Sequence, residues 1–435
     1  MVMNQEKNEW ISNMTPLITR WRRDLHQNAE VGYCEYVTTH YIYENLKSLD
    51  FELFMGQEVL QDDARLGVPH PEELKIHEKR AIVQGVPYSF LEKMKGGFTG
   101  VVARLDTGRP GKHFALRFDI DALPIDEAIE ESHLPEKEQF RSNNKGMMHA
   151  CGHDGHIAIG LGFAHFLHEH KKFLNGSFTL LFQPAEEGCC GAQAIVKKGW
   201  LENVDYFLSG HVGIHNLPVG TIVASATDIF ATTKIDVKIV GETAHAGIRP
   251  HEGKNALLAG SALAHALHSI APHGEGMTRL NVGRLCAGSG RNVVAGNAIL
   301  ELETRGSSTK ENDYMKEEAI RRIEGIAKMY GVETTYSIVG EGISAKSDSF
   351  WHDAILQATK SSSFVTNVLE TMPLNASEDA TYMMKRVQET GGKSVYMIYG
   401  TPLAAGHHHR LFDFDEGVLP VALSTLVELI WRLNK

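Results

Sequence analysis

The chain has 435 residues, more than the roughly 250–300 that one hydrophobic core usually supports, so we expect two domains. Its formal net charge of −11 argues against nucleic acid or an anionic membrane surface as a partner. We also expect a cytoplasmic protein, because the sequence has no apolar run long enough for a membrane span, no signal-peptide pattern and no disulfide framework among its five cysteines.

The first half of the chain alternates expected helices with expected strands. We predict helix over 8–50, a charged insertion of short helices over 55–97, strands over 100–105 and 113–118, helix over 157–173 and a strand over 177–182. This alternation is typical of an α/β fold with a mainly parallel central sheet whose faces are covered. Ligands of such sheets usually bind in the loops that follow the strands.

A different order of expected strands and helices begins near residue 233. Strands over 234–240, 279–286, 298–304 and 333–339 alternate with helices over 254–270 and 310–330, in the order βαββαβ. This order predicts a ferredoxin-like unit. Helices over 351–360, 378–390 and 414–433 and a strand over 394–399 follow. We therefore predict a discontinuous domain of residues 1–230 and 342–435, with residues 231–341 inserted as a second domain.

A dense group of metal-binding residue types occupies MHACGHDGH at 148–156. Further members of this kind occur in QPAEEG at 183–188, in GHV at 210–212 and in a triple histidine at 407–409. Cysteine, histidine and glutamate side chains bind borderline divalent metals. Candidate ligands spread over about 260 residues indicate a catalytic metal centre, because a structural metal site usually takes its ligands from one short segment. The sequence therefore predicts a metallohydrolase.

Each side chain of the first two motifs has an expected role. Gly152 can turn the backbone so that Cys151 and His153 face one point, where a divalent ion would keep the thiol ionised. Successive extended residues point in opposite directions, so we expect Glu187 to bind metal and Glu186 to face the cleft. Metal lowers the pKa of bound water to roughly 7, and Glu186 is then the general base that passes a proton to the leaving amine.

Several neighbouring residues keep two interpretations. His149 and His156 are either partners of the ligands or core residues, and the cysteines at 189–190 are expected to be small buried residues. The acidic pair at 119–121 is either a turn or, as its place at a strand end favours, a pair that orients the ligands. The triplet at 407–409 is either an exposed loop or the source of one buried ligand.

The motifs MHACGHDGH, QPAEEG, GHV, TAHAG, RNVV and SEDA resemble, over nearly the whole chain, the amidohydrolase branch of the aminoacylase and glutamate carboxypeptidase-like metallohydrolases. The resemblance implies a zinc-peptidase-like catalytic domain, an inserted lid and dimerisation domain, and two divalent ions per chain, Mn²⁺ or Zn²⁺. The implied ligands are Cys151, His153, Glu187, His211 and His408. We choose His408 from the triplet because family members place this ligand four residues before an aromatic position, here Phe412.

The resemblance also implies roles for the inserted domain. His245 in TAHAG would reach across a homodimer interface to stabilise the oxyanion in the partner's site. Asn292 in RNVV and Arg305 would bind the free carboxylate of the substrate, a task that suits the planar fork of an arginine. A homologous second subunit is a further expected partner.

The implied reaction is hydrolysis of a small N-acyl amino acid, with an aroyl-glutamate such as p-aminobenzoyl-glutamate as the expected substrate. Hippurate, N-acetyl and indoleacetyl amino acids are alternative substrates for the same chemistry. Two other classes stay open: a metal-free hydrolase with Cys151 as nucleophile, and a partner subunit without catalytic activity.

Overall fold

The structure is a computed structural model that describes residues 2–434. The chain divides into two compact units, and each is described by itself. The larger unit contains residues 1–227, 346–374 and 379–435, whereas the smaller unit contains residues 228–345 and 375–378.

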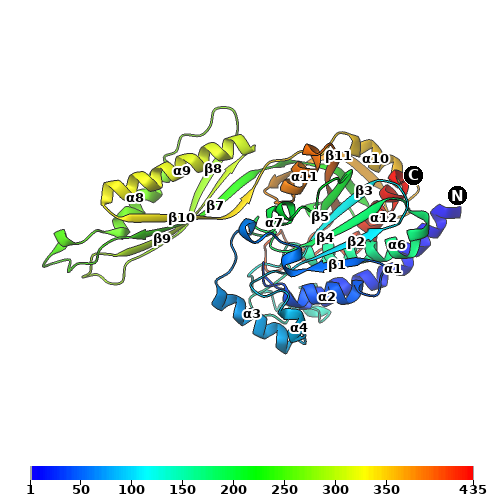
Figure 1. Cartoon of the computed structure of the whole chain (residues 1–435), viewed down its shortest axis with the longest axis horizontal. Coiled ribbons are helices and arrows are strands. Elements are labelled where there is room, and N and C mark those ends of the chain that lie inside the picture. The colour runs from blue at the N-terminus through cyan, green and yellow to red at the C-terminus, as the bar shows by residue number, and fades with distance from the viewer. Residues whose placement is uncertain (1, 435) are drawn as a thin grey trace. The chain divides into compact units, whose positions relative to one another are not determined.

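The larger unit is built on an eight-stranded sheet with the order β1-β2-β4-β3-β5-β12-β6-β11 (Figure 1). Its strands are β1 (Glu52–Met55), β2 (Val101–Asp106), β3 (His113–Asp119), β4 (Ser177–Gln183), β5 (Tyr206–Asn216), β6 (Thr221–Ile229), β11 (Asn367–Ala376) and β12 (Lys393–Thr401). In the centre, β3 runs parallel to β4 and β5, and β12 runs parallel to β5. The predicted parallel sheet is confirmed there, although β1, β2 and β6 pair antiparallel toward the edges.

Helices cover both faces of this sheet. They are α1 (Val2–Gln27), α2 (Tyr36–Leu46), α3 (Pro71–Val83), α4 (Tyr88–Leu91), α5 (Leu134–Lys137), α6 (His153–His170), α7 (Ala192–Lys198), α10 (Phe350–Thr359), α11 (Ala380–Glu389) and α12 (Val418–Leu433), with short 3-10 turns η1 (Gly56–Glu58), η2 (Asp62–Ala64) and η3 (Lys171–Phe173). Within the described residues, no helix combines the length and apolar character that crossing a membrane requires.

The alternation of side chains along β3 separates the two helical layers. Phe118 faces α6, where Gly160 permits close packing because a Cβ atom there would lie 2.7 Å from the Phe118 ring. Arg117, the preceding residue, points to the opposite face and donates to Asp379 beside α11. Helices α1, α6 and α12 pack against one another on the first face.

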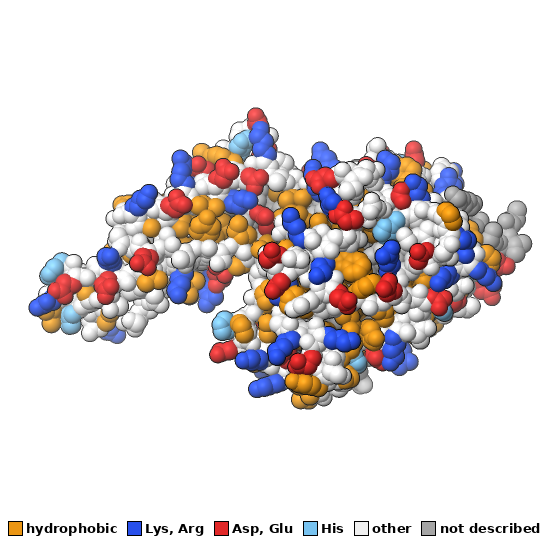
Figure 2. Space-filling model, in the orientation of Figure 1, with side chains coloured by type: hydrophobic (Ala, Val, Ile, Leu, Met, Phe, Trp, Pro, Cys, Tyr) orange, Lys and Arg blue, Asp and Glu red, His pale blue; other side chains and the backbone are white. Residues whose placement is uncertain are grey.

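The smaller unit has the predicted βαββαβ order. Its elements are β7 (Ala231–Val240), η4 (Pro250–Glu252), α8 (Ala256–His268), β8 (Thr278–Ala287), β9 (Asn297–Gly306), α9 (Thr309–Tyr330) and β10 (Glu333–Gly342). The four strands form one antiparallel sheet of order β10-β7-β9-β8, and α8 and α9 bury their apolar sides on it. On the face in Figure 2, acidic and basic side chains are interspersed over both units.

The structure differs from the sequence prediction in two places. The helical stretch over 8–50 is two helices, because the chain turns between them at Tyr33, whose φ is 60°. This break lets the Tyr33 hydroxyl donate to the main-chain oxygen of Cys190 at 2.8 Å. The second difference is in the sheet, where the sequence prediction placed no strands at β1, β5, β6 and β11.

Candidate metal centre and active site

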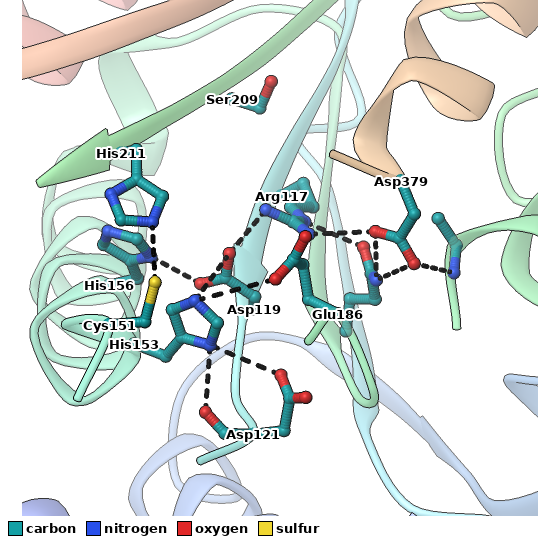
Figure 3. A network of polar contacts seen from close by, with 12 residues as sticks. Arg117, Asp119, Asp121, Cys151, His153, His156, Glu186, Ser209, His211 and Asp379 are labelled. Carbon is teal, nitrogen blue, oxygen red and sulfur yellow. Dashed lines mark hydrogen bonds and ion pairs between the residues drawn. The ribbon is translucent and has the colours of Figure 1, made fainter. Parts of the chain in front are cut away.

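The residues predicted to bind metal meet at one edge of the large sheet. Asp119 ends β3, the bend with Glu186 and Glu187 follows β4, and His211 lies on β5. Cys151 lies two residues before α6, and the histidine triplet follows β12. The carboxyl ends of β3, β4 and β12 thus contribute to the site, and α/β sheets usually bind ligands at such ends. Figure 3 shows Cys151, His153 and His211 pointing toward one another at this edge.

Gly152 places Cys151 and His153 on one side of the chain. Its φ of 92° is in the left-handed region, and it caps the start of α6. The Cys151 sulfur lies 3.4 Å from Nε2 of His211 and 3.5 Å from Nδ1 of His407. A backbone turn at a glycine therefore positions the thiol at the centre of the histidines.

Main-chain oxygens orient three histidine rings in the same way. Nδ1 of His153 lies 2.9 Å from the oxygen of Asp121, and Nδ1 of His211 lies 2.9 Å from the oxygen of Val212. Nε2 of His407 lies 2.9 Å from the oxygen of Gly213. Each ring donates one N–H to a main-chain oxygen, so its second nitrogen is turned toward the space beside Cys151. This arrangement is typical of histidines that bind metal.

The donor atoms form two groups that share Cys151. Cys151, His211 and His407 form one group, and Cys151, His153 and Glu187 form the other, with the donor atoms of each group within 4.8 Å of one another. Nε2 of His153 is buried without a hydrogen-bond partner. Sulfur, imidazole and carboxylate donors at such spacing fit borderline divalent ions, and a shared thiolate fits two ions side by side.

A tight bend after β4 presents the two glutamates. Ala185 and Cys189 have φ values of 55° and 57°, and Gly191 approaches Pro184 so closely that a Cβ atom would lie 1.9 Å from its oxygen. The Glu187 amide donates to Oδ2 of Asp121 at 3.0 Å. Asp121 thus holds both His153 and Glu187.

Glu186 is buried at the edge of the donor groups. Its Oε2 lies 4.0 Å from Nε2 of His153, and Figure 3 shows its carboxylate pointing into the same space as that of Asp119. It belongs to neither group that contains Cys151. The two adjacent glutamates therefore occupy different positions relative to Cys151.

The electrostatics of the site favour a bound cation. Burial raises the pKa of the Cys151 thiol well above its usual range, and the Glu187 and Glu186 carboxylates raise it further. Burial lowers the pKa of His153, but Asp119 and Asp121 outweigh burial and raise it to about 10. Burial also lowers the pKa of His211 and takes that of His407 to about 4, so both rings are neutral. A divalent cation would relieve this excess of negative charge.

His156 is a partner of the site residues and has no nitrogen left for a metal. Its Nε2 accepts from the Val212 amide at 2.9 Å, and its Nδ1 therefore donates to Oδ1 of Asp119 at 2.5 Å. Although burial opposes it, Arg117, His153 and His156 lower the pKa of Asp119. His149 is buried, and both of its ring nitrogens lack a hydrogen-bond partner.

Sequence reasoning missed a buried network behind the bend (Figure 3). The Arg117 guanidinium donates to Gln183 at 2.8 Å, to Asp119 at 2.6 Å and to Asp379 at 3.2 Å. Asp379 also accepts from the amides of Gly191 and Ala192, at 3.1 and 3.0 Å. Asp379 lies in the SEDA motif, to which the sequence analysis gave no role. The network connects the bend that contains Glu186 and Glu187 to β3.

The structure brings His407, rather than His408, against Cys151. The His408 side chain is 55% exposed, and its Nε2 lies 3.3 Å from Oε2 of Glu187. The φ of His408 is 64°, and its amide donates to the oxygen of Ala150 at 2.8 Å. This left-handed turn points consecutive side chains of the triplet in different directions. His408 as a ligand stays a prediction.

In the smaller unit, His245 and Asn292 lie close together, whereas Arg305 does not join them. The Ala246 amide donates to the oxygen of Asn292 at 3.0 Å, and His245 pairs with Val293. Nδ1 of His245 accepts from the amides of Gly247 and Ile248, which leaves Nε2–H of the exposed ring as a donor.

Arg305 lies near the opposite end of β9, about 26 Å from its start at the rise of an extended strand. Its guanidinium pairs with Glu303 at 2.7 Å. The two residues predicted to bind a carboxylate, Asn292 and Arg305, are thus separated within one chain.

Comparison with known proteins identifies the class of protein to which the chain belongs. A family model described as Peptidase family M20/M25/M40 matches residues 115–432. The chain belongs to this family, and it is a hydrolase that cleaves amide bonds. The resemblance seen in the motifs and the predicted fold class are both confirmed.

Two curated relatives and one solved structure are similar over nearly the whole chain. The chain is 45% identical over 420 residues to one of the subunits of p-aminobenzoyl-glutamate hydrolase from Escherichia coli K12, covering 96% of each chain. It is also 45% identical over 420 residues to indole-3-acetyl-aspartic acid hydrolase of Enterobacter agglomerans, again covering 96% of each. The crystal structure of an aminobenzoyl-glutamate utilization protein from Klebsiella pneumoniae matches with a TM-score of 0.82 and 38% identity, covering 98% of this chain and 97% of that chain.

Proposed function

We propose that the chain is a dinuclear metal-dependent amidohydrolase that converts p-aminobenzoyl-glutamate to p-aminobenzoate and glutamate. The single observation that carries the proposal is the position of Cys151 as the shared member of two donor groups, with Glu186 beside them. The relatives with matching names support the substrate.

In this account Cys151, His153, Glu187, His211 and His407 hold the two ions, either Mn²⁺ or Zn²⁺. Bound ions would polarise the amide carbonyl and lower the pKa of water. His407 enters the set on geometry, because its Nδ1 lies 3.5 Å from the Cys151 sulfur. The sequence-based choice, His408, is tested separately below.

Glu186 is the general base of the proposed reaction. Its carboxylate takes a proton from the attacking water and returns it to the nitrogen of the leaving glutamate. Burial in a bend held by Asp379 and Asp121 keeps this carboxylate in one position. A positioned base contributes more to catalysis than a mobile one.

His245 completes the site from a second copy of the chain. Because Nδ1 accepts from two amides, Nε2–H is available to donate to the oxyanion of the partner's substrate. Asn292 lies beside His245 and would bind the substrate carboxylate from the same copy. Arg305 lies at the opposite end of β9, so it would bind that carboxylate only from the other copy of the chain. A homodimer is therefore part of the proposal. The Escherichia coli relative is named as one subunit of its enzyme, so we also propose a homologous second subunit as a partner.

The second candidate function is the same amide hydrolysis with a different acyl group on the substrate. The Enterobacter agglomerans relative, equally similar in sequence, is named for indole-3-acetyl-aspartic acid. Both relatives are named for substrates that release an acidic amino acid. Hippurate and N-acetyl amino acids are further candidate substrates.

The two remaining alternatives fit the site less well. A cysteine nucleophile needs a thiolate, yet burial and the neighbouring glutamates raise the pKa of Cys151. A partner subunit without catalytic activity would not need Glu186 at the edge of the donor groups.

A substrate panel tests the proposal. The purified chain, supplied with Mn²⁺ or Zn²⁺, is assayed for amino-acid release from p-aminobenzoyl-glutamate, indole-3-acetyl-aspartate, hippurate and an N-acetyl amino acid, with and without a chelator. We expect chelator-sensitive release of glutamate from p-aminobenzoyl-glutamate. Turnover that survives complete metal removal would overturn the metal mechanism, and a clear preference for another amide would overturn the substrate assignment.

A further inference from the structure

One fully buried cation lies beside the metal centre without belonging to it. Arg22 on α1 is 0% exposed and contacts three carboxylates from distant parts of the chain. Its Nε donates to Asp154 at 2.9 Å, its Nη2 to Asp413 at 2.5 Å and its Nη1 to Glu416 at 3.1 Å. All three nitrogens of the guanidinium are therefore occupied.

The contact between Arg22 and Asp154 connects α1 to the start of α6. Asp154 follows His153 in the first turn of that helix. Its Oδ1 accepts from the Gly155 amide at 2.9 Å, and its Oδ2 accepts from both Arg22 and His26, the latter at 2.8 Å. Arg22 thus fixes the helical turn from which the His153 ring projects.

The contacts of Arg22 with Asp413 and Glu416 connect α1 to the segment after the histidine triplet. The Arg22 guanidinium lies 4.5 Å from the Phe414 ring, and that ring packs on Gly155, where a Cβ atom would lie 2.8 Å from it. The Phe412 ring lies 4.8 Å from the ring of His407. Arg22 therefore joins the segment that carries His407 to the helix that carries His153.

We propose that Arg22 is a positioning residue of the metal centre. It holds the first turn of α6 and the segment 407–416 at the separation at which His153 and His407 both face Cys151. This inference rests on the proposed function, because it assumes that these side chains bind metal. Three donors in one rigid plane suit the task, whereas a lysine offers a single mobile charge.

The same helix provides a matched control. Lys7 on α1 donates to Glu428 on α12 at 2.5 Å, and the two side chains are 5% and 4% exposed. This ion pair is nearly as buried as that of Arg22, but neither residue adjoins a proposed ligand. Removing Arg22 takes the partner from three carboxylates and removing Lys7 takes it from one, so both variants should lose stability.

Cobalt binding separates a positioning role from a general structural one. Metal-free wild type, Arg22→Met, Arg22→Lys and Lys7→Met are titrated with Co²⁺, and the sulfur-to-cobalt absorption band reports occupation beside Cys151. We expect Arg22→Met to weaken Co²⁺ binding by about 10- to 100-fold, the range for residues that orient metal ligands. Arg22→Lys should recover part of the affinity, and Lys7→Met should bind like wild type.

Wild-type Co²⁺ affinity in Arg22→Met, or an equal loss in Lys7→Met, would overturn the proposal. If Arg22→Met does not fold, Asp413→Asn removes one of the three carboxylates that Arg22 contacts, and its Co²⁺ affinity is judged by the same criterion. The failure of the proposed function looks different. In that case wild type takes up no Co²⁺, or its absorption band persists in Cys151→Ser.

Discussion

The Cys151 sulfur lies 3.4 Å from Nε2 of His211, with the second nitrogen of that ring held by the oxygen of Val212. The same sulfur belongs to a second group with His153 and Glu187. A thiol in this position can join two cations, and the neutral state of His211 leaves its Nε2 lone pair available as a ligand. The arrangement shows how candidate ligands from segments that are distant in sequence meet at one thiol.

The first prediction concerns Glu186. Glu186→Gln keeps the size of the side chain but removes the base, so turnover should fall by at least about 100-fold. Bound metal should stay at the wild-type level, because Glu186 belongs to neither group that contains Cys151. Steady-state kinetics and elemental analysis of the same preparation measure both quantities. Unchanged turnover would contradict the assignment of the base.

The second prediction separates His407 from His408. His407→Ala should lower the bound metal to about one ion per chain, because it removes a donor from one of two sites. His408→Ala should keep more metal than His407→Ala, since the His408 side chain is 55% exposed and lies outside the donor groups. Metal analysis after gel filtration compares the two. The reverse order would restore the sequence-based choice of His408.

The third prediction tests the contribution of a second copy. Glu186→Gln and His245→Ala should each be inactive alone, because one lacks the base and the other the oxyanion donor. When both variants are mixed, unfolded and refolded together, part of the activity should return. In a mixed dimer, one site combines an intact Glu186 with the partner's intact His245. A mixture as inactive as its components would argue that His245 acts within its own chain.

The order of the elements in the smaller unit could be predicted from the sequence, and the reasons are local. The βαββαβ unit follows from alternation and helical spacing within short windows, and the glutamate bend follows directly from an apolar strand. Strand β5 was missed because Gly210 and His211 interrupt its apolar pattern. The proposed ligand His211 thus also obscures the strand that positions it.

Other parts of the site depend on contacts that no sequence window contains. Arg22 and Asp413 are 391 positions apart, and Arg117 and Asp379 are 262 apart. The choice between His407 and His408 depends on the left-handed turn at φ 64° and on the hydrogen bond to Ala150. Motif spacing places a ligand within the triplet but cannot show which ring turns inward.

The fourth prediction concerns the dependence of stability on pH. Burial lowers the pKa of His26, but hydrogen bonds to Asp154 and Glu127 outweigh it and raise the pKa to about 9. An unfolded histidine titrates near about 6.5, so the stabilisation is complete below that pH and is lost as the pH rises toward about 9. His26→Gln should therefore be less stable than wild type in mild acid, with a difference that shrinks in mild alkali.

Urea unfolding of both proteins, stripped of metal, at several pH values measures this difference. Removing metal first keeps metal release from contributing to the free energy of unfolding. A difference that stays constant from mild acid to mild alkali would show that folding does not raise the pKa of His26.

The most direct test of the central claim is a titration of the metal-free chain with Mn²⁺, in which bound metal and hydrolysis of p-aminobenzoyl-glutamate are followed together. We expect no turnover without metal and full turnover only when two ions are bound. In Cys151→Ser, we expect the loss of both turnover and the binding of two ions. Turnover in the metal-free chain, or two bound ions and full activity in Cys151→Ser, would contradict the central claim.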